Sequence, residues 1–194
     1  MKLSCILGHK WNGCRCERCG EVRLEGVNDP SSLKELVLDS QVDDAFRLQA
    51  LDRITDNDTL FELVTNRFIE MPMWIAAIRK IDDQALIRRV ISKIPYRTTD
   101  VLRHSRISQE SMLELFKWGN LNHLDALPEF FTDPDLIAEG LLHISSVNDN
   151  SYELNAIAPK LIRKLKGTPQ LEKVANETNS KMISNLAKHE LGLI

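Results

Sequence analysis

From about residue 30 onward, apolar residues recur at intervals of three and four positions, the spacing that places them on one face of an α-helix. The alternation of apolar and polar residues that is typical of strands is not seen in this part of the sequence. The pattern therefore predicts an all-α fold of short helices separated by polar turns. One such turn, Asp29-Pro30-Ser31-Ser32, precedes the first helix, and a serine is predicted to cap that helix.

The helical pattern repeats between about residues 40 and 145. Each copy has an apolar residue that ends one helix, then a polar turn, then apolar residues six and nine positions further on. The first of these apolar residues, spaced by 27, 26 and 24 positions, are Ile54, Ile81, Ile107 and Phe131. Those at six and nine positions beyond are Leu60 and Leu63, Ile87 and Val90, Leu113 and Phe116, and Ile137; the fourth copy has Gly140 at the ninth position instead of an apolar residue.

The polar turns explain how each copy starts its next helix. Asp, Ser and Thr oxygens can accept hydrogen bonds from the first free N–H groups of a helix; the turns are Thr55-Asp56, Asp82-Asp83, Ser108-Gln109 and Thr132-Asp133. Pro134 suits the first turn of such a helix. Because pairs of short helices cannot bury their apolar faces alone, we expect them to stack into a right-handed α-solenoid. Residues 150–194 break the period and are predicted to form longer capping helices, with Gly167 between the first two.

Glycine and charge set the first residues apart from this helical region. Four of the eight glycines lie in residues 1–26, which predicts a boundary between a small segment, 1–26, and a helical repeat domain, 30–194. Residues 1–24 carry a net charge of +3, whereas the whole chain carries −3. The overall acidity disfavours nucleic acid as a partner. Neither a membrane span nor a signal peptide is apparent, so we expect a cytoplasmic protein with no membrane partner.

All four cysteines lie in the first 19 residues, in the pattern Cys5-x3-His9-x4-Cys14-x-Cys16-x2-Cys19-Gly20. In a reducing compartment, clustered cysteines favour a metal over disulfides. The preferred ligands are Cys5, His9, Cys16 and Cys19 around a structural Zn²⁺. Cys14, separated from Cys16 by a single residue, is predicted to be left out; in the alternative set it is the fourth ligand and Cys5 or His9 is left out. Gly20 is expected at a positive φ, and Trp11 is expected to cover the site.

Two resemblances concern this cluster and the repeats. The string from Cys5 to Gly20, with its G-H-x-W and C-x2-C-G elements, resembles a short zinc-ribbon-like segment of uncharacterised bacterial proteins, which implies zinc binding and a bacterial source. The repeats resemble degenerate HEAT-like repeats, although a period of about 26 is shorter than the roughly 40–47 residues of HEAT or armadillo repeats. They are also similar to the leucine-rich repeat variant class, which carries an iron–sulfur cluster. That alternative would make thiolate ligands of Cys5, Cys14, Cys16 and Cys19.

No catalytic constellation is apparent in the sequence, which predicts a protein that is not an enzyme. The histidines beyond the cluster have no ligand spacing; they are His104, His123, His143 and His189. A nucleic-acid-binding or DNA-modifying surface is a second hypothesis, formed by Arg88, Arg89, Arg97, Arg103, His104 and Arg106 with Trp74, Tyr96 and Trp118 as aromatic candidates. Trp74 and Trp118 lie in apolar runs that favour a place in the core.

The sequence therefore predicts a non-catalytic scaffold or adaptor that binds a protein partner on the surface of its solenoid and holds a structural zinc ion. A nucleic-acid-binding protein and an iron–sulfur or redox sensor are the alternatives.

Overall fold

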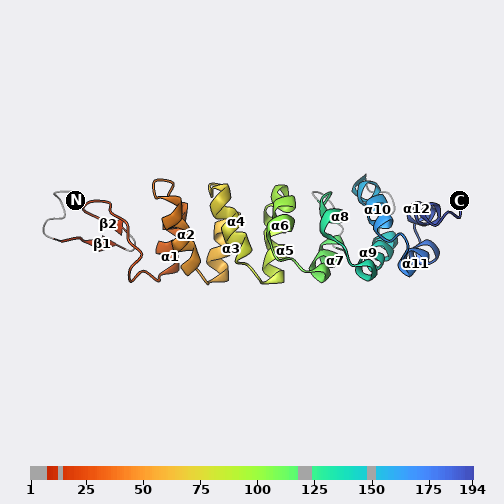
Figure 1. The fold of residues 1–194 in the computed structure, drawn as a ribbon, viewed down its shortest axis with the longest axis horizontal. Helices are drawn as coiled ribbons and strands as arrows, with labels where there is room; N and C mark the ends of the chain where they lie inside the picture. The colour runs from red at the N-terminus through yellow and green to blue at the C-terminus, as the bar shows by residue number, and fades with distance from the viewer. Residues whose placement is uncertain (1–7, 13–14, 118–123, 148–151) are drawn as a thin grey trace. The chain divides into compact units, whose positions relative to one another are not determined.

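A computed structural model of the chain describes residues 8–12, 15–117, 124–147 and 152–194. These residues are mostly helical, with one small pair of strands, which confirms the predicted predominance of helix (Figure 1). The strands β1 (Trp11–Asn12) and β2 (Arg15–Cys16) are antiparallel. The helices are α1 (Pro30–Leu38), α2 (Asp44–Arg53), α3 (Asn57–Thr65), α4 (Met71–Arg79), α5 (Gln84–Lys93), the 3-10 helix η2 (Pro95–Arg97), α6 (Thr98–His104), α7 (Gln109–Lys117), α8 (Leu127–Phe130), α9 (Pro134–Val147), α10 (Tyr152–Lys164), α11 (Pro169–Glu177) and α12 (Lys181–Glu190).

The chain forms two compact units, Met1–Ile81 and Asp82–Ile194. In the first unit α1 packs on α2 and α3 on α4, while α1 also contacts α3 and α2 contacts α4. In the second unit α5, α7, α9 and α11 contact one another in chain order, and so do α6, α8, α10 and α12 (Figure 1). Each unit is thus built from helix pairs whose first and second members form separate rows. The boundary predicted at residues 26–30 falls inside the first unit and stays a prediction.

The capping prediction is confirmed at each of the four predicted turns. Asp56 accepts a hydrogen bond from the N–H of Thr59, and Asp83 accepts from those of Ala85 and Leu86. Ser108 and Asp133 cap α7 and α9 in the same way. The prediction that a serine caps the first helix is wrong. Asp29 accepts the bond from the N–H of Ser32, because its carboxylate stands directly before Pro30, the first residue of α1.

In the first unit, a charged residue of one helix pair and an apolar residue of the next hold equivalent positions. Arg47 is the fourth residue of α2 and Trp74 is the fourth residue of α4, and both side chains are buried. The Nε of Arg47 donates to the carbonyl of Val37 at 2.9 Å, and Nε1 of Trp74 donates to that of Val64 at 2.9 Å. Each acceptor is the eighth residue of the preceding helix. In two successive pairs, the side chain at the fourth position of the second helix thus donates a hydrogen bond to a carbonyl near the C-terminal end of the first helix.

In the second unit two glutamines join successive pairs. The Gln84 side chain donates to the carbonyl of Arg106 and accepts from the N–H of Ser108, at 2.9 and 2.7 Å. Gln109 does the same one pair later, donating to the carbonyl of Phe130 and accepting from the N–H of Thr132. Each glutamine therefore fixes the backbone of the turn that starts the next pair.

Gly140 departs from the apolar pattern for a reason visible in the packing. It is buried in α9, and a β-carbon there would lie 2.5 Å from Cδ1 of Phe116. The Phe116 ring, fully buried in α7, occupies the volume that a side chain at residue 140 would need. The missing apolar side chain of one pair is therefore replaced by a large one from the pair before it.

Candidate metal centre

The cluster is assembled by a short hairpin. Strands β1 and β2 pair Trp11 with Cys16, and the N–H of Glu17 donates to the carbonyl of Lys10 at 2.8 Å. This pairing brings His9, just before β1, opposite the turn that follows β2. The turn closes through a 2.8 Å bond from the N–H of Gly20 to the carbonyl of Cys16. Gly20 has a φ of 73°, as predicted for the residue that ends this turn.

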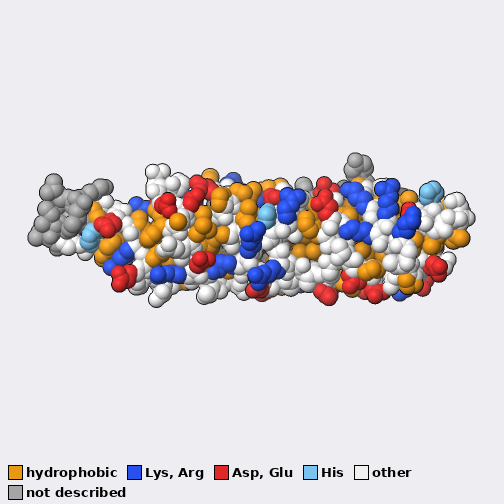
Figure 2. All heavy atoms as spheres, viewed as in Figure 1, with side chains coloured by type: hydrophobic (Ala, Val, Ile, Leu, Met, Phe, Trp, Pro, Cys, Tyr) orange, Lys and Arg blue, Asp and Glu red, His pale blue; other side chains and the backbone are white. Residues whose placement is uncertain are grey.

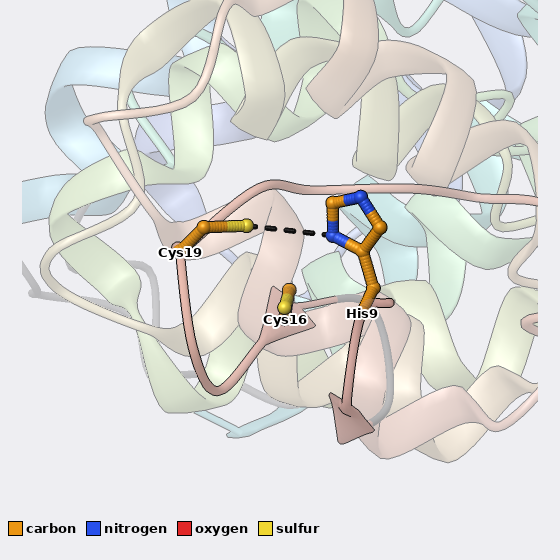
Figure 3. Close-up of side chains that lie close together, drawn as sticks. All are labelled: His9, Cys16 and Cys19. Atoms are coloured by element: carbon orange, nitrogen blue, oxygen red, sulfur yellow. Dashed lines mark hydrogen bonds between the residues drawn. The ribbon is translucent and has the colours of Figure 1, made fainter. Parts of the chain in front are cut away.

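Three predicted ligands come together in this hairpin, as Figure 3 shows. The ligand atoms of His9, Cys16 and Cys19 all lie within 4.8 Å of one another, close enough to bind one metal ion. The Sγ of Cys19 is 3.4 Å from Nδ1 of His9. Cys16 is buried and Cys19 is half-buried. The imidazole therefore presents Nδ1, rather than Nε2, to the sulfur atoms.

The surroundings of Cys16 favour the thiolate that a metal requires. Burial acts to raise the pKa of this thiol, but hydrogen bonds from the backbone of Cys19 and Arg18, and contacts with the His9 and Cys19 side chains, outweigh it and lower the pKa to about 6. Backbone N–H groups of the turn are thus directed at the sulfur of Cys16. Thiolates are the form in which cysteine binds metals.

Two further side chains contact the His9 imidazole, one at Nε2 and one on the face of the ring. Its Nε2 lies 3.5 Å from Oε2 of Glu21, and its ring stacks on Trp11 with centroids 5.1 Å apart. The guanidinium of Arg23 lies 4.1 Å from the centroid of Trp11. Trp11 thus covers His9, as expected. Glu21 and Arg23 were missed by sequence reasoning, and the position of Glu21 two residues after the last cysteine is too common a feature to have identified it.

The hairpin is also joined to the helices of its unit. Arg15 pairs with Asp39 at the end of α1, and Arg53 of α2 donates to the carbonyl of Leu24. The Nη1 of Arg18 donates to the carbonyl of Gly8 at 3.1 Å, which holds the residue before His9. The cluster is therefore built on backbone that is tied to packed helices.

The other predicted ligands, Cys5 and Cys14, lie outside the described residues, so the choice between them stays a prediction. Two sulfurs and one imidazole nitrogen are a donor set suited to a four-coordinate metal with one further ligand. Elsewhere in the described parts of the chain, no group of three His, Cys, Asp or Glu side chains converges in this way.

The structure buries one aromatic residue of the nucleic-acid hypothesis and gives two of its arginines partners within the protein. Trp74 is fully buried, as the apolar run predicted, whereas Tyr96 is 66% exposed. Arg88 donates to Ser111, and Arg106 pairs with Asp82. Of the remaining histidines, His104 is half-buried, and His143 and His189 are exposed. Trp118 and His123 lie outside the described residues.

Comparisons of the chain with protein-family models, curated proteins and solved structures gave no match. None of the described helices is long and apolar enough to cross a membrane. The chemistry of the cluster and the packing of the helices are therefore the grounds for a functional proposal.

Proposed function

We propose that this protein is a non-catalytic interaction module, a scaffold or adaptor of α-solenoid type, whose N-terminal hairpin holds a structural Zn²⁺. The observation that carries the zinc proposal is the convergence of His9, Cys16 and Cys19 within 4.8 Å. Sulfur and imidazole ligands in a C-x2-C turn are typical of structural zinc sites. His9 is also the reason to prefer zinc to an iron–sulfur cluster, which thiolates alone usually hold.

The helix packing supports the interaction role. Within each unit, successive helix pairs contact their neighbours through both rows of helices. Such stacking extends a surface in one direction, and repeat proteins use surfaces of this kind to bind other proteins. The fold class alone does not assign a function, so a direct test of binding is needed.

Metal analysis of the full chain, purified without chelators, tests the first half of the proposal. We expect one zinc per chain and a colourless protein. The Cys19→Ser variant should lose zinc while the far-ultraviolet circular dichroism of the helices is nearly unchanged, because metal binding and folding are coupled locally in so small a hairpin. Iron with inorganic sulfide would contradict the zinc proposal.

Affinity capture with the full chain, followed by cross-linking mass spectrometry, tests the second half. We expect a specific protein cross-linked to the helical units. Binding to duplex DNA with a steep dependence on salt would instead support the nucleic-acid alternative.

A further inference from the structure

Over α7 and α9 to α12, the second unit carries opposite charges on its two rows of helices, whereas α5, with Arg88, Arg89 and Lys93, does not follow this division. Cationic side chains gather on α10, on α12 and just after α10; they are Lys160, Arg163, Lys164, Lys166, Lys181 and Lys188. Acidic side chains predominate on the other row, in α7, α9 and α11, and include Glu110, Glu114, Asp135, Glu139, Glu172 and Glu177. Figure 2 shows the blue side chains over α10 and the red ones along the lower edge, where α7, α9 and α11 lie.

A groove runs between the two basic helices. Its apolar surface comes from Pro159 of α10 and Leu186 of α12, with the buried Ile162 beneath them, and its polar edge from Arg163, His189 and Glu190. The volume of the groove is about 270 Å³. This space suits one or two apolar side chains together with a charged group at the edge.

The edge of the groove already accommodates one carboxylate. Glu190 is half-buried and pairs with Lys166 at 2.9 Å, and its pKa is lowered by that hydrogen bond and further by Arg163 and His189. Among the described residues, Arg163 has no ion pair of its own and is exposed. Arg163 acts on Glu190 through its charge and forms no salt bridge with a described residue, so its exposed guanidinium offers a positive group to a further anion beside an apolar surface.

We propose that the groove between α10 and α12 binds an acidic segment of a partner protein, with an apolar side chain on Pro159 and Leu186 and a carboxylate on Arg163. This inference rests on the proposed interaction function and assigns it a surface. Charge complementarity selects the acidic partner. A peptide is favoured over a nucleic acid because the described residues that line the groove include no Phe, Tyr or Trp to stack on bases.

The test is a selection of random 12-residue peptides on the intact protein. We expect enrichment of sequences that place Asp or Glu beside a bulky apolar residue. One enriched peptide, synthesised with a fluorescent label, should bind Arg163→Glu at least about tenfold more weakly than the wild type. The matched control is Lys173→Glu, a charge reversal at an exposed position of α11, which should leave the affinity unchanged.

Several results would overturn the inference. These are the absence of enrichment, enriched peptides without acidic residues, or equal effects of Arg163→Glu and Lys173→Glu. Displacement of the peptide by a duplex oligonucleotide that binds more tightly would assign the surface to nucleic acid instead. If the full chain still captures its protein partner with Arg163→Glu, the groove assignment fails while the proposed interaction function stands.

Discussion

Gly140 offers the sharpest test of how the helix pairs pack. Alanine has the higher helix propensity, by about 1 kcal/mol, so Gly140→Ala would stabilise α9 if the site were open. The site is not open, because a β-carbon at residue 140 would lie 2.5 and 2.9 Å from two ring carbons of Phe116 and 3.3 Å from Leu113. Contacts under 3.0 Å require the neighbour to move.

Phe116 has little freedom to move. Its ring is fully buried and meets Phe131 edge to face, with centroids 6.4 Å apart. Overpacking a core of this kind costs about 1–3 kcal/mol. Because the contact with Phe116 is severe, we take the upper part of that range. After the gain in helix propensity, Gly140→Ala should lower the free energy of unfolding by about 1–2 kcal/mol.

A double-mutant cycle with Phe116→Leu isolates the contact. The smaller side chain makes room at residue 140, so Gly140→Ala should be neutral or stabilising in that background, and the coupling energy should be at least about 1 kcal/mol. The free energies come from urea unfolding followed by circular dichroism. Ser92→Ala, at an exposed position of α5, controls for propensity. A stabilising Gly140→Ala in the wild type, or strictly additive effects, would refute the packing argument.

Three further predictions concern the cluster, a cap and a buried hydrogen bond. Glu21→Gln should weaken zinc binding by about 10–100-fold in a chelator competition, because the carboxylate no longer orients His9; Glu17→Gln is the control, and equal affinities for the two variants would contradict this role. Asp83→Ala should lower the free energy of unfolding by about 1 kcal/mol in urea, since α5 loses its cap; an unchanged midpoint would dismiss the cap. Trp74→Phe should cost about 1–3 kcal/mol, because the carbonyl of Val64 loses its donor; a thermal midpoint equal to that of the wild type would count against that bond.

The sequence predicted the helices and their caps well because both depend on neighbours in the chain. Asp56, Asp83 and Pro134 act within one turn of their own positions. The first helix pair was not predicted to be a copy of the repeat, although Asp29 precedes Asp56 by the same 27 residues that separate Asp56 from Asp83. The repeat was defined by its apolar positions, and the first pair does not fit that definition because a buried Arg47 stands where the next pair has Trp74. Only the structure shows that the carbonyl of Val37 and the carboxylate of Glu70 satisfy this arginine.

The candidate site was predictable to a similar degree. The spacing of His9, Cys16 and Cys19 was enough to bring them together, because a hairpin of so few residues leaves little choice. The contacts of these three residues with the surrounding side chains were not predictable. A glutamate near a cysteine is common, and nothing in the sequence says that Glu21 faces Nε2 of His9 rather than water.

The junctions between helix pairs explain how the structure stays regular although the number of residues per pair varies. Gln84 and Gln109 bind the backbone of the turn that begins the next pair, so the starts of the pairs that begin with α7 and α9 are fixed by hydrogen bonds to the pair before them. The loop between the two helices of a pair takes no part in these bonds. Extra residues there change the spacing in the sequence without moving the junction. The first helices of successive pairs begin 27, 27, 25, 25 and 35 residues apart, yet in the second unit α5, α7, α9 and α11 still contact one another in order. The pairs that begin with α5 and α7 therefore share a polar junction rather than a fixed count of residues: each has a capping residue, Asp83 or Ser108, with a glutamine beside it that binds the next turn.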